Sequence, residues 1–184
     1  MITAAVWAEE VYNMRWPRFA VLVLITTLLQ ASGVDAIAVT RLNVAPDLLL
    51  IVMVFFAIRC NPTEAIISSF ALGFAADIVA TGFPMGPRLI SFVLFGTGLA
   101  YLHRVIAIRK MPHESLAILV VGFGAGGLAL LLALLAGQSP RPGVLGVLAG
   151  TSIYSAVLGP FLFLLLAWLM RIKSRRRGPP PATR

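Results

Sequence analysis

Two uncharged apolar stretches dominate the C-terminal half of the chain. They run over Ser115–Pro140 and Pro142–Met170, and only Arg141 separates them. Each is longer than the about 20 residues that a helix needs to cross the hydrocarbon core of a bilayer. The composition agrees, because 59% of the residues are hydrophobic and 12% are charged, whereas ordinary globular chains carry about 25% charged residues. The sequence therefore predicts an integral membrane protein and excludes a soluble domain.

The hydropathy pattern predicts a single all-α bundle of six transmembrane helices, with the membrane domain at residues 16–172. The expected spans are Pro17–Val39, Leu42–Ile58, Pro62–Ala80, Arg88–Ile108, Glu114–Gly137 and Val144–Ile172. The second and third approach the required length only when Asp47 or Asp77 is included near an end. The first resembles a signal peptide, but Glu9 and Glu10 before it and five spans after it favour a retained helix.

Two short segments flank this domain. Residues 1–15 are predicted to be cytoplasmic, and their pattern allows an interfacial helix with Val6, Trp7, Val11 and Met14 toward lipid. Residues 173–184 are basic and Pro-rich, and we expect a disordered cytoplasmic tail. A topological anchor explains this tail, and binding of a cytoplasmic partner is the alternative.

The positions of the basic residues predict the orientation, because short cytoplasmic loops are enriched in Lys and Arg. Twelve of the fifteen basic residues lie on the side of the two termini. The other three are Arg41, Arg88 and Arg141. Both termini are therefore predicted to be cytoplasmic, in a multi-pass membrane protein.

Alternate threading of the spans brings Asp47, Asp77 and Arg88 to the same, non-cytoplasmic end. Ionisable groups are costly inside a membrane and normally face the bundle interior, paired with one another. We expect these three residues to form one polar cluster in the outer half of the bundle. The alternative is that each side chain simply reaches lipid headgroups and water.

Small residues mark the helix contacts, since lipid gives little hydrophobic drive for helix association. Ala65, Ser69, Gly73 and Asp77 recur at four-residue spacing on one helix face. Two GxxxG patterns follow, at Gly122/Gly126 and Gly146/Gly150; both fit contacts within the bundle or with a partner's helix. Gly159-Pro160 is expected to bend the last span near its middle.

The sequence offers little catalytic equipment. It has no GxSxG, HExxH, Walker-type or CxxC motif, and one Cys and two His make a Cys/His metal site improbable. Cys60 is expected to be a free buried thiol. Asp47 and Asp77 could form a carboxylate pair for glycosyl chemistry only beside a substrate channel, and no feature of the sequence supplies water access or substrate-binding groups. We expect no enzyme, no cofactor, no metal and, despite a net charge of +8, no nucleic acid.

The stretches "APDLLLIVMVFFAIRCNP" and "GFAADIVATGFPMGPRLISFVLFGTGLAYL" resemble the bacterial rod shape-determining MreD family. The positions that carry the resemblance are Pro46, Asp47, Gly73, Asp77, Gly82, Gly86 and Arg88. The ending "GPFLFLLLAWLMRIKSRRR" also resembles the family's Pro-bent last helix and basic tail. Many members have Arg before Pro-Asp where this chain has Ala45, and Arg41 is the candidate substitute.

The resemblance implies a fold similar to the substrate-binding (S) subunit of energy-coupling-factor transporters. It also implies a non-enzymatic scaffold of the cell-wall elongation machinery, the elongasome, which directs lateral peptidoglycan synthesis and rod shape. The implied partners are MreC, then RodA and a class B penicillin-binding protein, and indirectly MreB, besides membrane lipids. Pro46, Asp47, Gly73, Asp77, Gly86 and Arg88 are then the candidate partner-binding or structural polar cluster.

Two other functions fit the same residues. One is a small-molecule-binding subunit of a transporter, with the charges facing a ligand cavity. The other is binding of the lipid-linked wall precursor in that cavity. A retained vitamin-sized ligand favours the transporter reading, whereas co-purification of MreC favours the scaffold.

The cluster hypothesis predicts slow reaction of cysteines placed at positions 47, 77 and 88 with a membrane-impermeant thiol reagent added from outside. The reason is that side chains inside the bundle are shielded from water. Free labelling at all three positions would contradict the hypothesis.

Overall fold

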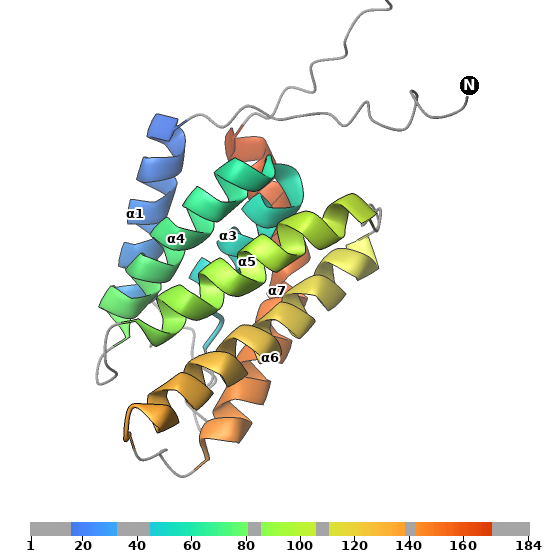
Figure 1. Cartoon of the computed structure of the whole chain (residues 1–184). Helices are drawn as coiled ribbons and strands as arrows, with labels where there is room; N and C mark the ends of the chain where they lie inside the picture. Colours follow the sequence, from blue (N-terminus) through green and yellow to red (C-terminus); the bar gives the residue numbers. More distant parts are fainter. Residues whose placement is uncertain (1–15, 33–44, 81–85, 106–110, 139–142, 171–184) are drawn as a thin grey trace, which may run out of the picture.

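The computed structural model describes residues 16–32, 45–80, 86–105, 111–138 and 143–170. These residues form helices α1 (Trp16–Ser32), α3 (Leu48–Arg59), α4 (Pro62–Val79), α5 (Pro87–Val105), α6 (Met111–Leu135) and α7 (Val144–Met170). Figure 1 shows successive helices running in alternate directions through one bundle. The all-α prediction is confirmed for the described residues.

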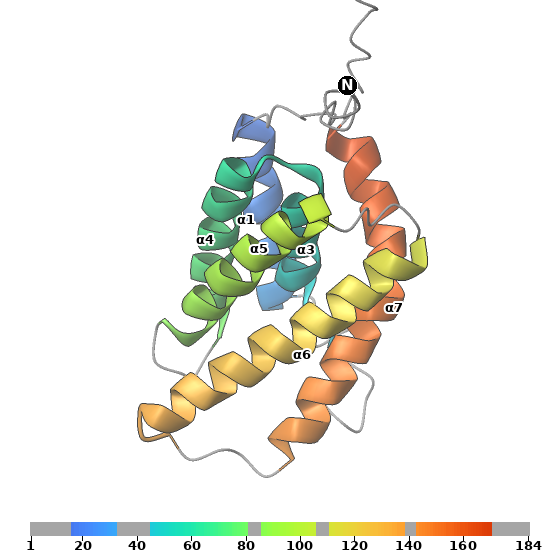
Figure 2. The ribbon, with the colours of Figure 1, turned by 45° about the vertical axis from the view of Figure 1, so that its right-hand side comes forward.

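Helix α3 lies at the centre of the bundle. It contacts each of the other five described helices, and Figure 2 shows it enclosed among α1, α4, α5 and α7. All ten residues of Leu49–Ile58 are at most 5% exposed. The strong hydrophobicity of this segment therefore serves packing in the protein core.

The predicted helix Leu42–Ile58 is wrong at its start, because α3 begins at Leu48. Pro46 has no N–H to donate and biases Ala45 toward extended backbone, and Asp is a favoured N-cap residue. The 12 residues of α3 rise about 18 Å, which is short of the about 30 Å hydrocarbon core. Helix α3 alone is therefore too short to span the membrane.

A chain of aromatic rings ties α3 to its neighbours. Phe19 of α1 meets Phe56 edge to face with ring centroids 5.1 Å apart, Phe56 meets Phe55 at 5.5 Å, and Phe55 meets Phe163 of α7 at 5.3 Å. Edge-to-face rings contribute about 0.5–1.5 kcal/mol per pair beyond the area they bury. These contacts fix α3 between the first and last helices.

The outer faces of the bundle are apolar. Exposed side chains include Leu24 and Leu28 on α1, Phe70 and Phe74 on α4, and Phe161 on α7. Within the described residues, three helical stretches are long and apolar enough to cross a membrane: Pro62–Val79, Glu114–Leu135 and Val144–Leu169. Shorter apolar helices are Trp16–Ser32, Leu48–Arg59 and Pro87–Leu102. The prediction of six complete spans is therefore supported for three helices by length.

The small-residue face of α4 lies in the contact with α5. Ala65, Ser69, Gly73 and Asp77 are all buried, and an added Cβ at Gly73 would meet the Leu89 Cα at 2.9 Å. A side chain at Gly73 would therefore press on backbone, which cannot rotate away. The close approach of α4 and α5 requires glycine at this position.

The glycines of α6 and α7 differ in their surroundings. Gly122 and Gly126 face Ser152 and Leu148 of α7, so this GxxxG pattern packs within the bundle. Gly146 is exposed and has no atom within 4 Å of an added Cβ. Helix α7 continues through Pro160, and Figure 2 shows it change direction near its middle.

An ion pair connects the other end of α3 to α6. The Arg59 guanidinium donates to the Glu114 carboxylate at 3.0 Å, and Glu114 is 7% exposed. Arg59 also lies in the last turn of α3, where a cation complements the helix dipole. Next to it, burial and then the Glu64 carboxylate raise the pKa of the half-buried Cys60 thiol to about 12. The thiol therefore stays protonated at neutral pH.

Several predictions fall outside the described residues. They concern the interfacial helix at residues 1–15, the basic tail at residues 173–184, and the candidate substitute Arg41. Gly82 and Arg141 also lie outside this part of the chain.

We expect Gly73→Ala to lower the free energy of unfolding by about 1–3 kcal/mol, because the added methyl separates the α4 and α5 backbones. Gly98→Ala is the matched control, since its Cβ meets no atom within 4 Å and alanine favours the helix. Thermal unfolding of the detergent-solubilised protein measures both. Equal stability of the two variants would show that the α4–α5 contact tolerates a side chain.

Candidate functional site

The Asp47 side chain caps the N-terminus of α3. Its Oδ1 accepts the Leu50 N–H at 3.0 Å, and the Asp47 backbone is extended, with φ −87° and ψ 92°. The first N–H groups of a helix have no partner within the helix, and leaving one unsatisfied in apolar surroundings costs about 1–3 kcal/mol. The Asp47 carboxylate at the start of this apolar helix therefore supplies a hydrogen-bond acceptor for a backbone N–H group that has no partner within the helix.

Two other side chains hold the same turn. The Asp47 N–H donates to Ser155 Oγ of α7 at 2.9 Å. The Gln30 amide of α1 accepts the Leu48 N–H at 2.9 Å and donates to the Pro46 carbonyl at 3.4 Å. The start of α3 is thus bound to both the first and the last helix.

Asp77 caps the N-terminus of α5 from the C-terminal end of α4. Its Oδ2 accepts the N–H groups of Gly86 at 2.9 Å and Leu89 at 3.0 Å, and its Oδ1 accepts the Arg88 N–H at 3.1 Å. Asp77 is 7% exposed. Both carboxylate oxygens therefore serve the α5 backbone, and the negative charge lies at the positive end of the helix dipole.

Gly86 makes this cap geometrically possible. Its φ is +123°, in a region that side-chain-bearing residues rarely adopt. An added Cβ would meet no atom within 4 Å, so available space does not explain the glycine. The glycine is explained by the positive φ angle, which turns the Gly86 N–H toward Asp77.

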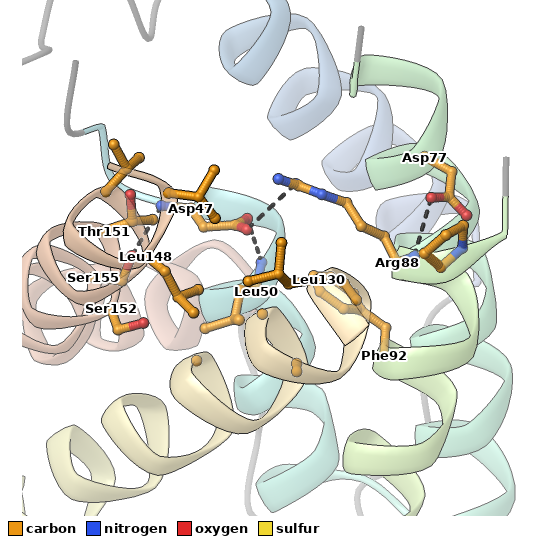
Figure 3. Close-up of a pocket in the computed structure, with 17 residues that line it drawn as sticks. Asp47, Leu50, Asp77, Arg88, Phe92, Leu130, Leu148, Thr151, Ser152 and Ser155 are labelled. Atoms are coloured by element: carbon orange, nitrogen blue, oxygen red, sulfur yellow. Dashed lines mark hydrogen bonds and ion pairs between the residues drawn. The ribbon is translucent and has the colours of Figure 1, made fainter. Parts of the chain in front are cut away.

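Arg88 connects the two capped helices. Its backbone N–H donates to Asp77, and its guanidinium reaches back to Asp47, with Nη1 3.7 Å from Oδ2. Figure 3 shows the arginine extending from α5 across to Asp47 at the start of α3. The Arg88 side chain is 41% exposed and that of Asp47 is 14% exposed. The structure therefore brings the three predicted residues together, with Arg88 contacting both aspartates.

A partly open cavity of about 350 Å³ adjoins this cluster. Asp47, Asp77 and Arg88 line it together with residues of α6 and α7, as Figure 3 shows. Its apolar wall includes Phe92, Leu130 and Leu148, and its hydroxyl groups are Thr151, Ser152 and Ser155. Figure 3 places Asp47 beside Ser155 on one side and Arg88 on the other.

The other predicted site residues have structural surroundings. Pro46 is fully buried, and its carbonyl accepts from Gln30. Gly73 lies against Leu89 in the α4–α5 contact, and Gly86 belongs to the Asp77 cap. None of the three lines the cavity.

Sequence reasoning missed Gln30 and the hydroxyls of α7. Gln30 is an amide within the first apolar run, and Thr151, Ser152 and Ser155 share a face of the last one. Polar residues in such runs signal pairing inside a bundle. The pairing of Arg59 with Glu114 was also missed, since their spans are not neighbours in the sequence.

The arrangement limits the chemistry available to the two aspartates. Both Asp77 oxygens accept backbone N–H groups, so this carboxylate is committed to a structural role. Among the described residues, no group of three or more His, Cys, Asp or Glu is placed to hold a metal ion. The remaining features of the site are the partly exposed Arg88 side chain, the hydroxyl groups of α7 and the apolar walls of the cavity.

Fold and site define the class as a helical membrane protein with a centrally buried short helix and, at one end, a mostly apolar cavity bordered by a polar cluster. The family model described as rod shape-determining protein MreD matches residues 12–173 of the 184. The chain therefore belongs to the MreD family, which gives it a role in cell shape determination. The searches of curated proteins and of solved structures gave no match, so the likeness to transporter S subunits stays a prediction.

We expect Asp77→Asn to destabilise the protein more than Asp47→Asn. An amide at position 77 turns an NH₂ group toward backbone N–H donors, which costs about 1–3 kcal/mol. Asparagine at position 47 still caps α3 and loses only a partly exposed ion pair, which contributes about 1 kcal/mol or less. Thermal unfolding in detergent measures the difference. Equal losses would indicate that charge, rather than backbone capping, explains both aspartates.

Proposed function

We propose that this protein is a non-enzymatic membrane scaffold of the cell-wall elongation machinery that binds MreC at the Asp47–Arg88 cavity. In this proposal the chain lies in the bacterial inner membrane with both termini in the cytoplasm. The cavity then faces the outer half of the bilayer, and association with RodA and a class B penicillin-binding protein proceeds through the same assembly.

The observation that carries the proposal is the exposed ion pair beside an apolar cavity. Both Asp77 oxygens accept backbone N–H groups, whereas the Arg88 side chain is 41% exposed and its Nη1 lies 3.7 Å from Asp47 Oδ2. Apolar walls with a few placed polar groups are typical of recognition sites. Family membership supports the setting in cell shape determination.

Small residues on α6 favour a helical partner. Gly122, Ala125, Gly126 and Ala129 line the cavity, and small residues allow helices to approach closely in membranes. A cavity of about 350 Å³ admits side chains from one face of a helix. This matches a scaffold that binds a partner's transmembrane helix or its juxtamembrane segment.

We expect the double variant Asp47→Asn/Arg88→Gln to reduce recovery of MreC with the tagged chain from native membranes about fivefold or more, given the energy of charge-assisted hydrogen bonds. Rod shape should be lost in the same cells. The matched control is Arg59→Gln/Glu114→Gln, which neutralises the ion pair at the other end of α3. Equal recovery from the two variants would refute the site assignment.

The same cavity supports a second candidate, a small-molecule-binding transporter subunit. Its volume lies at the lower end of the about 300–1,000 Å³ range of ligand pockets, and polar groups converge at one side. Native mass spectrometry of the purified protein distinguishes the two. A retained vitamin-sized ligand, lost in the Arg88 variant, would favour the transporter, and recovery of MreC without such a ligand favours the scaffold.

A further inference from the structure

We infer that the cavity binds the C-terminal turn of a partner's apolar helix, whose free carbonyl groups accept hydrogen bonds from Arg88 and the hydroxyls of α7. This inference rests on the proposed scaffold function and specifies which part of the partner is recognised.

Hydrogen-bond donors exceed acceptors around the cavity. Arg88 carries five N–H donors on its guanidinium, and within the described chain its side chain has only the 3.7 Å ion-pair contact with Asp47. That separation is longer than a hydrogen bond. The arginine therefore presents unused donors to an occupant.

The hydroxyls of α7 add to this excess. Serine and threonine in helices often donate to the carbonyl four residues back, as Thr26 does to Leu22 at 2.8 Å and Ser91 to Pro87 at 2.7 Å. No such bond is donated by Thr151, Ser152 or Ser155 among the described residues. Ser155 only accepts, from the Asp47 N–H. These three hydroxyls line the cavity, and each has an O–H group that can donate to an occupant.

The carboxylate groups beside the cavity have few oxygen atoms left to accept hydrogen bonds from these donors. Both Asp77 oxygens accept backbone N–H groups, and Asp47 Oδ1 accepts from Leu50. The Asp47 Oδ2 atom, already beside Arg88, is the remaining carboxylate acceptor of the cluster. A suitable occupant must therefore bring several acceptors.

The charges of the cluster favour an occupant whose hydrogen-bond acceptors are neutral. The two carboxylates lie at the positive ends of the α3 and α5 dipoles and offset them, and Asp47 also lies beside Arg88, so a phosphate or carboxylate bound to Arg88 would be repelled by Asp47. Helix C-termini supply four carbonyl groups without an intrahelical partner and only about half a negative charge. Carbonyl groups of this kind fit Arg88 without strong repulsion from Asp47.

The walls of the cavity fit the rest of such a helix. Phe92, Leu130 and Leu148 provide apolar contacts, and Gly126 and Ala129 allow close approach to α6. The occupant would end where α3, α5 and α7 begin, so it runs antiparallel to these three helices. If this end is the outer one, the partner helix enters the membrane from the cytoplasm.

Photo-crosslinking tests the inference with the full chain in cells that contain tagged MreC. A photoreactive residue at Val147, which lines the cavity, should cross-link to the last turn of the MreC transmembrane helix. The matched site is Ile153 of the same helix, which is 53% exposed and outside the cavity lining. Arg88→Ala should lower the yield at position 147 about fivefold to tenfold, and Arg88→Lys should lower it less.

Two phenylalanine substitutions, one inside the cavity and one outside it, distinguish a loss of partner binding from a loss of folding. Ala129→Phe fills the cavity and should abolish the cross-link from position 147 while thermal stability is kept. Leu131→Phe, at a 51% exposed neighbouring position outside the lining, should leave the cross-link unchanged. Equal yields in the two variants would overturn the inference.

The outcomes distinguish the two proposals. If MreC co-purifies but cross-links from position 147 through the middle of its helix, or only from position 153, the scaffold stands and this inference is wrong. If MreC does not co-purify but position 147 captures the last turn of another membrane helix, the inference stands with a different partner. Adducts at position 147 with phospholipid or with a second copy of the chain, or no adduct at all, would overturn it.

Discussion

The structure depends on satisfying the backbone N–H groups of helices that begin inside apolar surroundings. Helices α3 and α5 both start at the same end of the bundle, and each receives a carboxylate there. In apolar surroundings, each unpaired N–H would cost about 1–3 kcal/mol. Asp47 and Asp77 remove this cost, and Arg88 then joins the two capped ends. The polar cluster therefore has a structural role at the starts of α3 and α5, and the proposed partner contact involves the part of Arg88 that this role leaves exposed.

The buried helix α3 explains why both of its ends carry ion pairs. A 12-residue helix that contacts all five neighbours cannot place its ends in bulk water as a long span does. Asp47–Arg88 holds one end, and Arg59–Glu114 holds the other. Of these two pairs, the first lines the cavity, which is why we propose partner binding at that end.

Part of the fold and of the site could be predicted from the sequence. Hydropathy located the helices, and the small residues before Asp77 predicted a close helix contact, which Gly73 makes with Leu89. The predicted start of the second helix was wrong, because hydropathy alone does not register that Pro46 and the Asp47 N-cap begin the helix at Leu48. Gln30, Ser155 and the Arg59–Glu114 pair were missed, since their partners are distant in sequence.

The sequence by itself determined the membrane class, the family resemblance and the chain segments that carry Asp47, Asp77 and Arg88. These properties follow from local composition and from order along the chain. Only the tertiary structure decided that Asp77 accepts backbone N–H groups while Arg88 pairs with Asp47 at the edge of a cavity. The physical reason is that hydropathy is a property of one segment, whereas a hydrogen-bond partner depends on how separate helices pack.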